Sequence, residues 1–106
     1  MKKYDMTRDY CRLREVEFKY KGSSSTDPNP RVMVTSQNQY EIRGFNVNHL
    51  SKRTVKDILK EWKSVQNQPW ATATKERVVL NRIGKRARKG FRSYKMGNVK
   101  SKISTF

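Results

Sequence analysis

Residues 51–66, SKRTVKDILKEWKSVQ, constrain the fold more than any other stretch of this chain. Their apolar side chains recur at the three- and four-residue spacing of one helix face, at Val55, Ile58, Leu59, Trp62 and Val65. Ser51 can cap this helix, because its hydroxyl can accept a hydrogen bond from an unpaired N–H of the first turn. The pattern predicts an amphipathic helix over 51–66 that packs on the rest of the chain.

The opposite face of the same helix is basic. Its cations are spaced at i, i+4, i+8 and i+11, at Lys52, Lys56, Lys60 and Lys63. Like charges four residues apart destabilise a helix by about 0.2–0.5 kcal/mol per pair. Two interpretations remain open for this stripe: a solvated face that keeps the helix soluble, and a line of contact with an anionic partner.

Charge is the dominant compositional fact. The 106 residues carry 25 Lys and Arg against 9 Asp and Glu, a formal net charge of +16, and no carboxylate follows Glu76. Self-repulsion on this scale favours a polyanionic or acidic partner. With 34% hydrophobic residues, the chain is long enough for one small domain over 1–106 with a modest core.

The first half of the chain reads as strands. Val16, Phe18 and Tyr20 alternate with charged residues, as in a half-exposed strand. GSSSTDPNP over 22–30 predicts a mobile loop. The next two apolar segments, 31–35 and 40–47, predict a β-hairpin, and a bulge at Gly44 is expected to return Phe45 and Val47 to the core.

The second half predicts a helix and two further strands. Pro69 ends the first helix, Thr74 can cap a second basic helix over 74–89, and Gly84 weakens that helix. Trp70, in the connection, is expected to plug the core. Residues 91–95 and 99–106 read as short strands around a turn at 96–98. The expected fold class is therefore α+β: a small antiparallel sheet or partial barrel of four or five strands, with one amphipathic and one basic helix.

The strongest functional signal is GKRARKGFRSYKMGNVKSK over 84–102, which holds eight Lys or Arg and no acid. Such a run is typical of a phosphate-binding surface, although a solvated basic tail would look the same. Phe91 and Tyr94 within it are candidates for stacking on bases. The expected nucleic-acid-binding residues are Lys52, Lys56, Lys60, Lys63, Arg82, Lys85, Arg86, Arg88, Lys89, Phe91, Arg92, Tyr94, Lys95, Lys100 and Lys102.

Catalytic signals are weak. His49 has no Cys or Asp at metal-ligand spacing, Cys11 has no base partner, and Asp5 and Asp9 are flanked by cations that suit surface ion pairs better than a metal site. We therefore expect no enzyme activity, no metal and no cofactor. No apolar run approaches the roughly 20 residues of a membrane-spanning helix, and no apolar stretch follows Lys2 and Lys3 as in a signal peptide. The expected location is cytoplasmic, with packaging into a virion an open alternative.

Two short blocks carry a resemblance. GFNVNHLS at 44–51 and RSYKMGNVKSKI at 92–103, about 20 of the 106 residues, resemble blocks in small DNA- or virion-associated proteins of large tailed bacteriophages, some of them DNA-end-protector-like. The resemblance implies a phage origin, a host-cytoplasmic location, a compact barrel-like domain and DNA rather than RNA as the partner. This chain is shorter and more basic than the longer members of that group.

Together these features predict a non-enzymatic protein that binds nucleic acid, DNA in preference to RNA, through its phosphate backbone. Two alternatives belong to other classes. One is a virion or ribosome-associated structural protein, and the other is a small phage factor that binds and inhibits an acidic host protein. No helix-turn-helix or zinc finger supports sequence-specific readout, and oligomeric state leaves no trace in the sequence.

Overall fold

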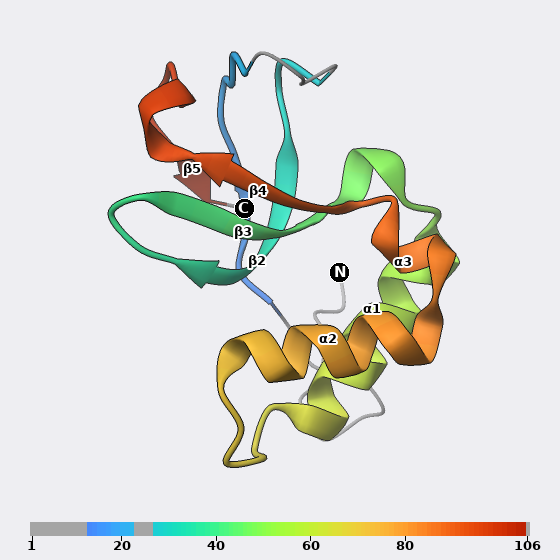
Figure 1. The fold of residues 1–106 in the computed structure, drawn as a ribbon. Helices are drawn as coiled ribbons and strands as arrows, with labels where there is room; N and C mark the ends of the chain where they lie inside the picture. Colours follow the sequence, from blue (N-terminus) through green and yellow to red (C-terminus); the bar gives the residue numbers. More distant parts are fainter. Residues whose placement is uncertain (1–12, 23–26, 106) are drawn as a thin grey trace.

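The computed structural model describes residues 13–22 and 27–105 (Figure 1). The interpretations of Asp5, Asp9 and Cys11, and of the middle of the loop at 22–30, lie outside the described residues. In chain order the elements are β1 (Glu15–Glu17), β2 (Arg31–Gln37), β3 (Glu41–Asn46), the 3-10 turn η1 (Val47–His49), α1 (Lys52–Val65), α2 (Thr72–Ile83), α3 (Lys85–Arg88), β4 (Phe91–Lys95), the 3-10 turn η2 (Met96–Asn98) and β5 (Ser104–Thr105).

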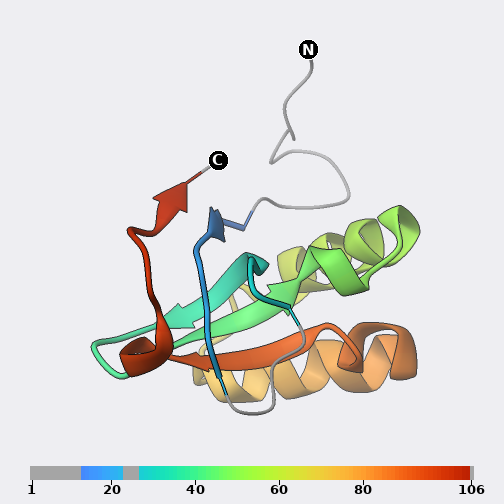
Figure 2. The same cartoon turned by 90° about the horizontal axis from the view of Figure 1, so that it is seen from above.

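The strands form one antiparallel sheet in the order β4-β3-β2-β1-β5. The last strand thus returns beside the first, and a 3-10 turn joins β4 to the segment that leads there (Figure 2). The three helices are inserted between β3 and β4. Since one fold can host many unrelated functions, function has to be argued from the site. The expected α+β class, with a five-stranded antiparallel sheet, is confirmed.

The β2–β3 hairpin is present, but its irregularity differs from the expected one. The register shifts between Val34 and Ser36, so the extra residue lies on β2 and not at Gly44. A Cβ at Gly44 would lie 2.0 Å from the carbonyl oxygen of Met33, so Gly44 permits two strand backbones to approach closely. The expected bulge at Gly44 is therefore wrong, and the bulge lies across from it.

The sheet is covered on both faces, which explains the change of phase along β3. Phe45 packs with the helices in a cluster of Met33, Phe45, Ile58, Leu59, Trp62, Val65, Val79 and Ala87. Ile42 lies in a second cluster with Val16, Phe18, Val32 and Tyr94. Because each face has its own apolar cluster, Ile42 and Phe45 are both buried although they lie in opposite phase, without a bulge in β3.

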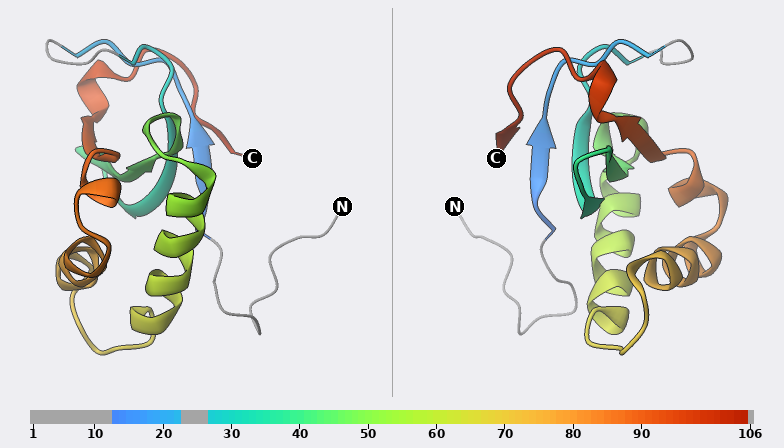
Figure 3. Two further views of the ribbon diagram at one scale, coloured as in Figure 1. Left: turned by 90° about the vertical axis from the view of Figure 1, so that its right-hand side faces the viewer. Right: turned by 60° about the vertical axis from the view of Figure 1, so that its left-hand side comes forward.

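The helices lie together on one side of the sheet (Figure 3). α1 closely matches the predicted helix, and Ser51 Oγ accepts the backbone N–H of Thr54 at 3.1 Å as expected of a cap. The predicted helix over 74–89 is divided in two, because Gly84 adopts a positive φ of 87° between α2 and α3. Ala71, which makes no side-chain cap bond, precedes α2, so the expected cap at Thr74 is wrong.

The C-terminal segment returns beside the first strand. Of the predicted strand at 99–106, only Ser104–Thr105 is a strand, and it pairs with β1. Upstream, Val99 forms an isolated bridge with Tyr20, and the Lys100 N–H donates to the Lys19 carbonyl at 2.8 Å. These contacts cover the face of the sheet opposite the helices.

Trp70 does not plug the core. Its exposure is 38%, whereas Trp62 on α1 is buried at 7% and lies among the core residues. The connection at Gln66–Ala71 therefore leaves one tryptophan at the surface. No helix within the described part of the chain is both long enough and apolar enough to cross a membrane.

Candidate nucleic-acid interface

The basic stripe of α1 is present as expected. Lys52, Lys56 and Lys60 are exposed and Lys63 is half-buried, while the opposite side of the helix carries the core residues Ile58, Leu59, Trp62 and Val65. Within 13–22 and 27–105, none of the four lysines pairs with a carboxylate. Their charges therefore face solvent without local compensation.

Two of the predicted phosphate-binding arginines have a structural role. Arg82 on α2 donates to Glu61 at 3.1 Å and to Ser64 Oγ at 2.9 Å, both on α1. Arg86 on α3 donates to Asp57 at 2.8 Å. These contacts tie α2 and α3 to α1, so a phosphate would have to compete with carboxylates that already hold both guanidinium groups.

The ion pairs among the described residues involve arginines and not lysines. The carboxylates of Glu15, Glu41, Asp57, Glu61 and Glu76 all pair with arginines, and no salt bridge among the described residues involves a lysine. Arginine suits this role because its planar guanidinium can bond a carboxylate through two N–H groups. The uncompensated positive charge of the described surface is consequently carried mainly by lysines.

α3 and the start of β4 add four more of the expected residues to the same end of the molecule as the N-terminus of α1. Lys85 and Lys89 are exposed and have no carboxylate partner within the described ranges. Arg88 donates to Asn81 Oδ1 at 2.9 Å, and Arg92 to the carbonyl of Phe91 at 2.9 Å. Because Arg86 donates to Asp57 in the second turn of α1, α3 lies beside the N-terminal half of α1 (Figure 1).

The two predicted stacking residues both contact the core. Phe91 is half-buried and packs on Phe45, with ring centroids 5.0 Å apart. Tyr94 is only 4% exposed, and its hydroxyl accepts a hydrogen bond from Asn46 Nδ2 at 3.0 Å. Burial raises the pKa of Tyr94, and the bond from Asn46 only partly opposes this effect. Tyr94 belongs to the core, so the expectation that it stacks on bases is wrong, whereas Phe91 packs against the core and stays partly exposed.

The last three expected residues lie elsewhere. Lys95, Lys100 and Lys102 are exposed around η2 and the segment before β5, at the far end of β4 from α3 (Figure 1). Lys100 Nζ donates to the carbonyl of Gly97 at 3.3 Å. The fifteen predicted residues therefore do not form one surface. The basic run at 84–102 begins at α3, passes through the core at Tyr94 and ends around η2.

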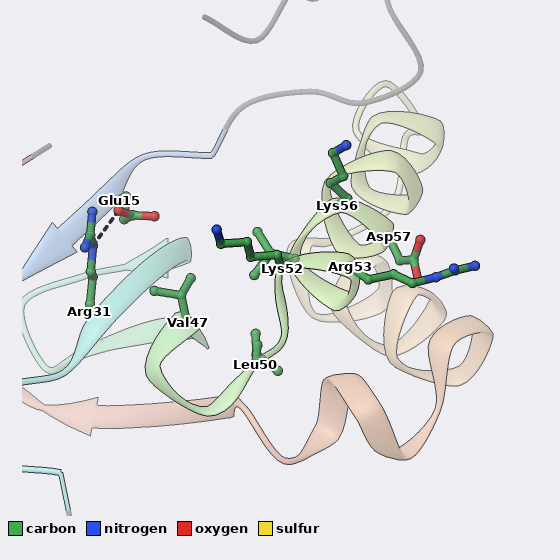
Figure 4. A pocket seen from close by; sticks show the side chains of 9 residues that line it. Glu15, Arg31, Val47, Leu50, Lys52, Arg53, Lys56 and Asp57 are labelled. Carbon is green, nitrogen blue, oxygen red and sulfur yellow. Dashed lines mark hydrogen bonds and ion pairs between the residues drawn. The ribbon is translucent and has the colours of Figure 1, made fainter.

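A groove that the sequence did not reveal lies beside α1 (Figure 4). Its volume is about 950 Å³, and it runs between the helix-facing side chains of β1 and β2 and the first turns of α1. Arg31 and Arg53, which were not among the expected residues, line it together with Lys52 and Lys56. The alternation along β2 shows only that Arg31 shares a face with Met33. No sequence pattern near Arg31 predicts that this face lies opposite α1.

The two blocks that carry the phage resemblance are neighbours in the fold. Gly44 pairs with Arg92 across β3 and β4, and Asn46 donates to Tyr94. Asn46 also donates to Asp27 at 2.8 Å, and Asn48 does so at 2.9 Å. Although burial alone would raise it, these bonds hold the pKa of Asp27 below its ordinary value. Residues of both blocks therefore join β3 to β4, and those of the first block also bind Asp27.

Within the described ranges, no group of three or more His, Cys, Asp or Glu could hold a metal ion. His49 lies 3.9 Å from Asp27 at the end of η1, shortly before Ser51, the cap of α1. Comparisons with models of protein families, with curated proteins and with solved structures found no match. The site therefore has to be interpreted from its own chemistry.

Proposed function

We propose that this protein binds nucleic acid through the phosphate backbone, without a catalytic step, using the helical end of the molecule. The observation that carries the proposal is that arginines form the ion pairs of the fold while lysines do not. Arginines pair with the carboxylates within the fold, while the lysines of α1 and α3 present positive charge on the helices that no carboxylate of the described residues pairs with. Point charges of this kind attract phosphates without reading sequence.

The proposed contact surface is defined by the stripe of α1 and the lysines of α3, namely Lys52, Lys56, Lys60, Lys63, Lys85 and Lys89. Lys52 and Lys63 are 11 residues apart, or about 16.5 Å along the axis at a rise of 1.5 Å per residue. A DNA strand offers a phosphate every 3.4 Å along the helix axis. The stripe is long enough for all four of its lysines to reach different phosphates.

DNA is the proposed form of nucleic acid, and the support for this choice is the resemblance of 44–51 and 92–103 to DNA- and virion-associated phage proteins. A phosphate-directed surface alone would accept RNA as well. The choice between them is therefore part of the test.

The test is a fluorescence-anisotropy titration with 30-base-pair duplex DNA, single-stranded DNA and duplex RNA at several salt concentrations. We expect all three to bind with a steep dependence on salt, and duplex DNA to bind more tightly than duplex RNA. Weak binding of all three at 150 mM salt would overturn the proposal and favour an acidic protein as the partner.

A further inference from the structure

The groove beside α1 has a charged wall on the helix side. Lys52 and Lys56 line it one helical turn apart, about 6 Å along the axis. The carboxylates that line it already have cationic partners, since Glu15 pairs with Arg31 at 2.7 Å and Asp57 with Arg86 at 2.8 Å. The two lysines have no carboxylate partner within the described residues. The groove is therefore suited to an anion.

The floor of the groove is apolar. Val47, Leu50 and Val55 line it, and all three are only partly buried where they pack against the helix-side core. A free phosphate would use the lysines and leave this floor in water. Burying an apolar surface contributes about 25 cal/mol per Å², so a ligand that also has a flat apolar face gains from both features.

From this pairing of charge and apolar floor we infer that the groove binds one unpaired nucleotide of a nucleic-acid strand, with its phosphate at Lys52 and Lys56 and its base on Val47, Leu50 and Val55. The inference rests on the proposed function and adds to it a preference for single-stranded ends. In a duplex both faces of an internal base are covered by its neighbours, so only an unpaired nucleotide can reach the floor. The volume of about 950 Å³ is sufficient for a group of that size.

The occupant with the nearest chemistry is an acidic peptide with an apolar side chain, which would also pair charge with an apolar contact. The nucleotide is favoured because the rest of the α1 stripe, Lys60 and Lys63, continues away from the groove along the helix. A strand whose end enters the groove can therefore keep its following phosphates on the same row of lysines.

The experiment compares a blunt 20-base-pair DNA duplex with the same duplex carrying a four-nucleotide single-stranded overhang, by fluorescence anisotropy at 100 mM salt. Two variants remove the same charge from the same helix: Lys52→Gln with Lys56→Gln in the groove, and Lys60→Gln with Lys63→Gln outside it. The parent protein should bind the overhang duplex at least about fivefold more tightly than the blunt one, because the unpaired nucleotide adds a contact. This advantage should vanish in the groove variant and persist in the other.

A third variant tests the floor. Val55→Thr keeps the shape of the side chain while making it polar, and it should reduce the overhang advantage while leaving binding of the blunt duplex unchanged. Equal binding of both duplexes by the parent protein, or equal loss of the advantage in the two double variants, would overturn the inference while leaving the proposed function intact. Failure of both duplexes to bind would instead overturn the proposed function. A leucine-containing polyglutamate peptide serves as the competitor for DNA. If it displaces DNA from the parent protein but not from the Lys52/Lys56 variant, and the parent shows no preference for the overhang duplex, the groove would be assigned to a protein partner.

Discussion

Removing the four lysines of the α1 stripe should change the salt dependence of DNA binding by a calculable amount. Each phosphate contact on duplex DNA contributes about 0.9 to the slope of log K against log salt. Replacing Lys52, Lys56, Lys60 and Lys63 by glutamine should therefore make the slope shallower by about 3.6 if all four contact phosphates. Between 50 and 200 mM salt, the parent protein should lose about 150-fold more affinity than the variant loses.

The assay is the same anisotropy titration on a 30-base-pair duplex at five salt concentrations, with circular dichroism to verify that the variant is folded. A matched control replaces four exposed lysines that lie away from the helical end, Lys19, Lys21, Lys95 and Lys102. The net charge falls equally in both variants, so only contact with phosphates distinguishes them. We expect the control slope to change by less than about 1. Equal changes in the two slopes would refute the assignment of the interface to α1, because binding would then follow net charge alone.

Three further predictions concern the fold that presents this interface. Glu76→Gln should lower the free energy of unfolding by about 2–3 kcal/mol in urea titrations, because Glu76 is 4% exposed and bonds Arg43 through both carboxylate oxygens; an unchanged midpoint would contradict this role. Gly44→Ala should cost at least about 3 kcal/mol or prevent folding, since its Cβ would lie 2.0 Å from the Met33 carbonyl oxygen; a Tm within 2 °C of the parent's, about the shift that 0.5 kcal/mol produces, would argue against it. The pKa of Asp27 is lowered in the folded state, so ionised Asp27 should stabilise the protein at pH values above its ordinary pKa of 3.8, and this contribution should be lost as the pH falls through the lower folded value. The stability difference between the parent and Asp27→Asn should therefore shrink on acidification. A constant difference from pH 7 to pH 2 would be inconsistent with the assignment.

The sequence predicted the elements whose signals are local. The α1 helix follows from a strong 3.6-residue period and a serine cap, and the β2–β3 hairpin follows from two apolar segments around a polar turn. The interruption of the second helix was foreseeable at Gly84, which has no Cβ and adopts a positive φ.

The rest depended on contacts between distant residues. The phase change at Gly44 predicts a bulge only if the sheet has a single core, whereas the C-terminal segment returns to cover a second apolar face of the sheet. Tyr94 lies in a basic stretch of the sequence, and only the fold shows that its ring packs edge-on against Tyr20 and Phe18. Both errors arise from one unrecognised feature, the second apolar cluster, which joins residues 16–20 to β2, β3 and β4.

The candidate site was predictable in part for the same reason. A lysine row on one helix face follows from spacing alone, so the stripe of α1 was found. The carboxylates that hold Arg82 and Arg86 lie 21 and 29 residues away on α1, so these ion pairs could not be seen in a local basic run. The groove required β2 to lie opposite the start of α1, which no local pattern specifies.

The central claim is that the helical end, and not the whole basic surface, contacts nucleic acid. Its most direct test is a two-dimensional amide NMR titration of the labelled protein with a 12-base-pair DNA duplex at 150 mM salt. The proposed interface predicts that the largest shift changes map to the exposed sides of α1 and α3, while the amides of η2 and of residues 99–105 change little. Shift changes of equal size at both ends of the molecule, or changes concentrated around Lys95, Lys100 and Lys102, would contradict it.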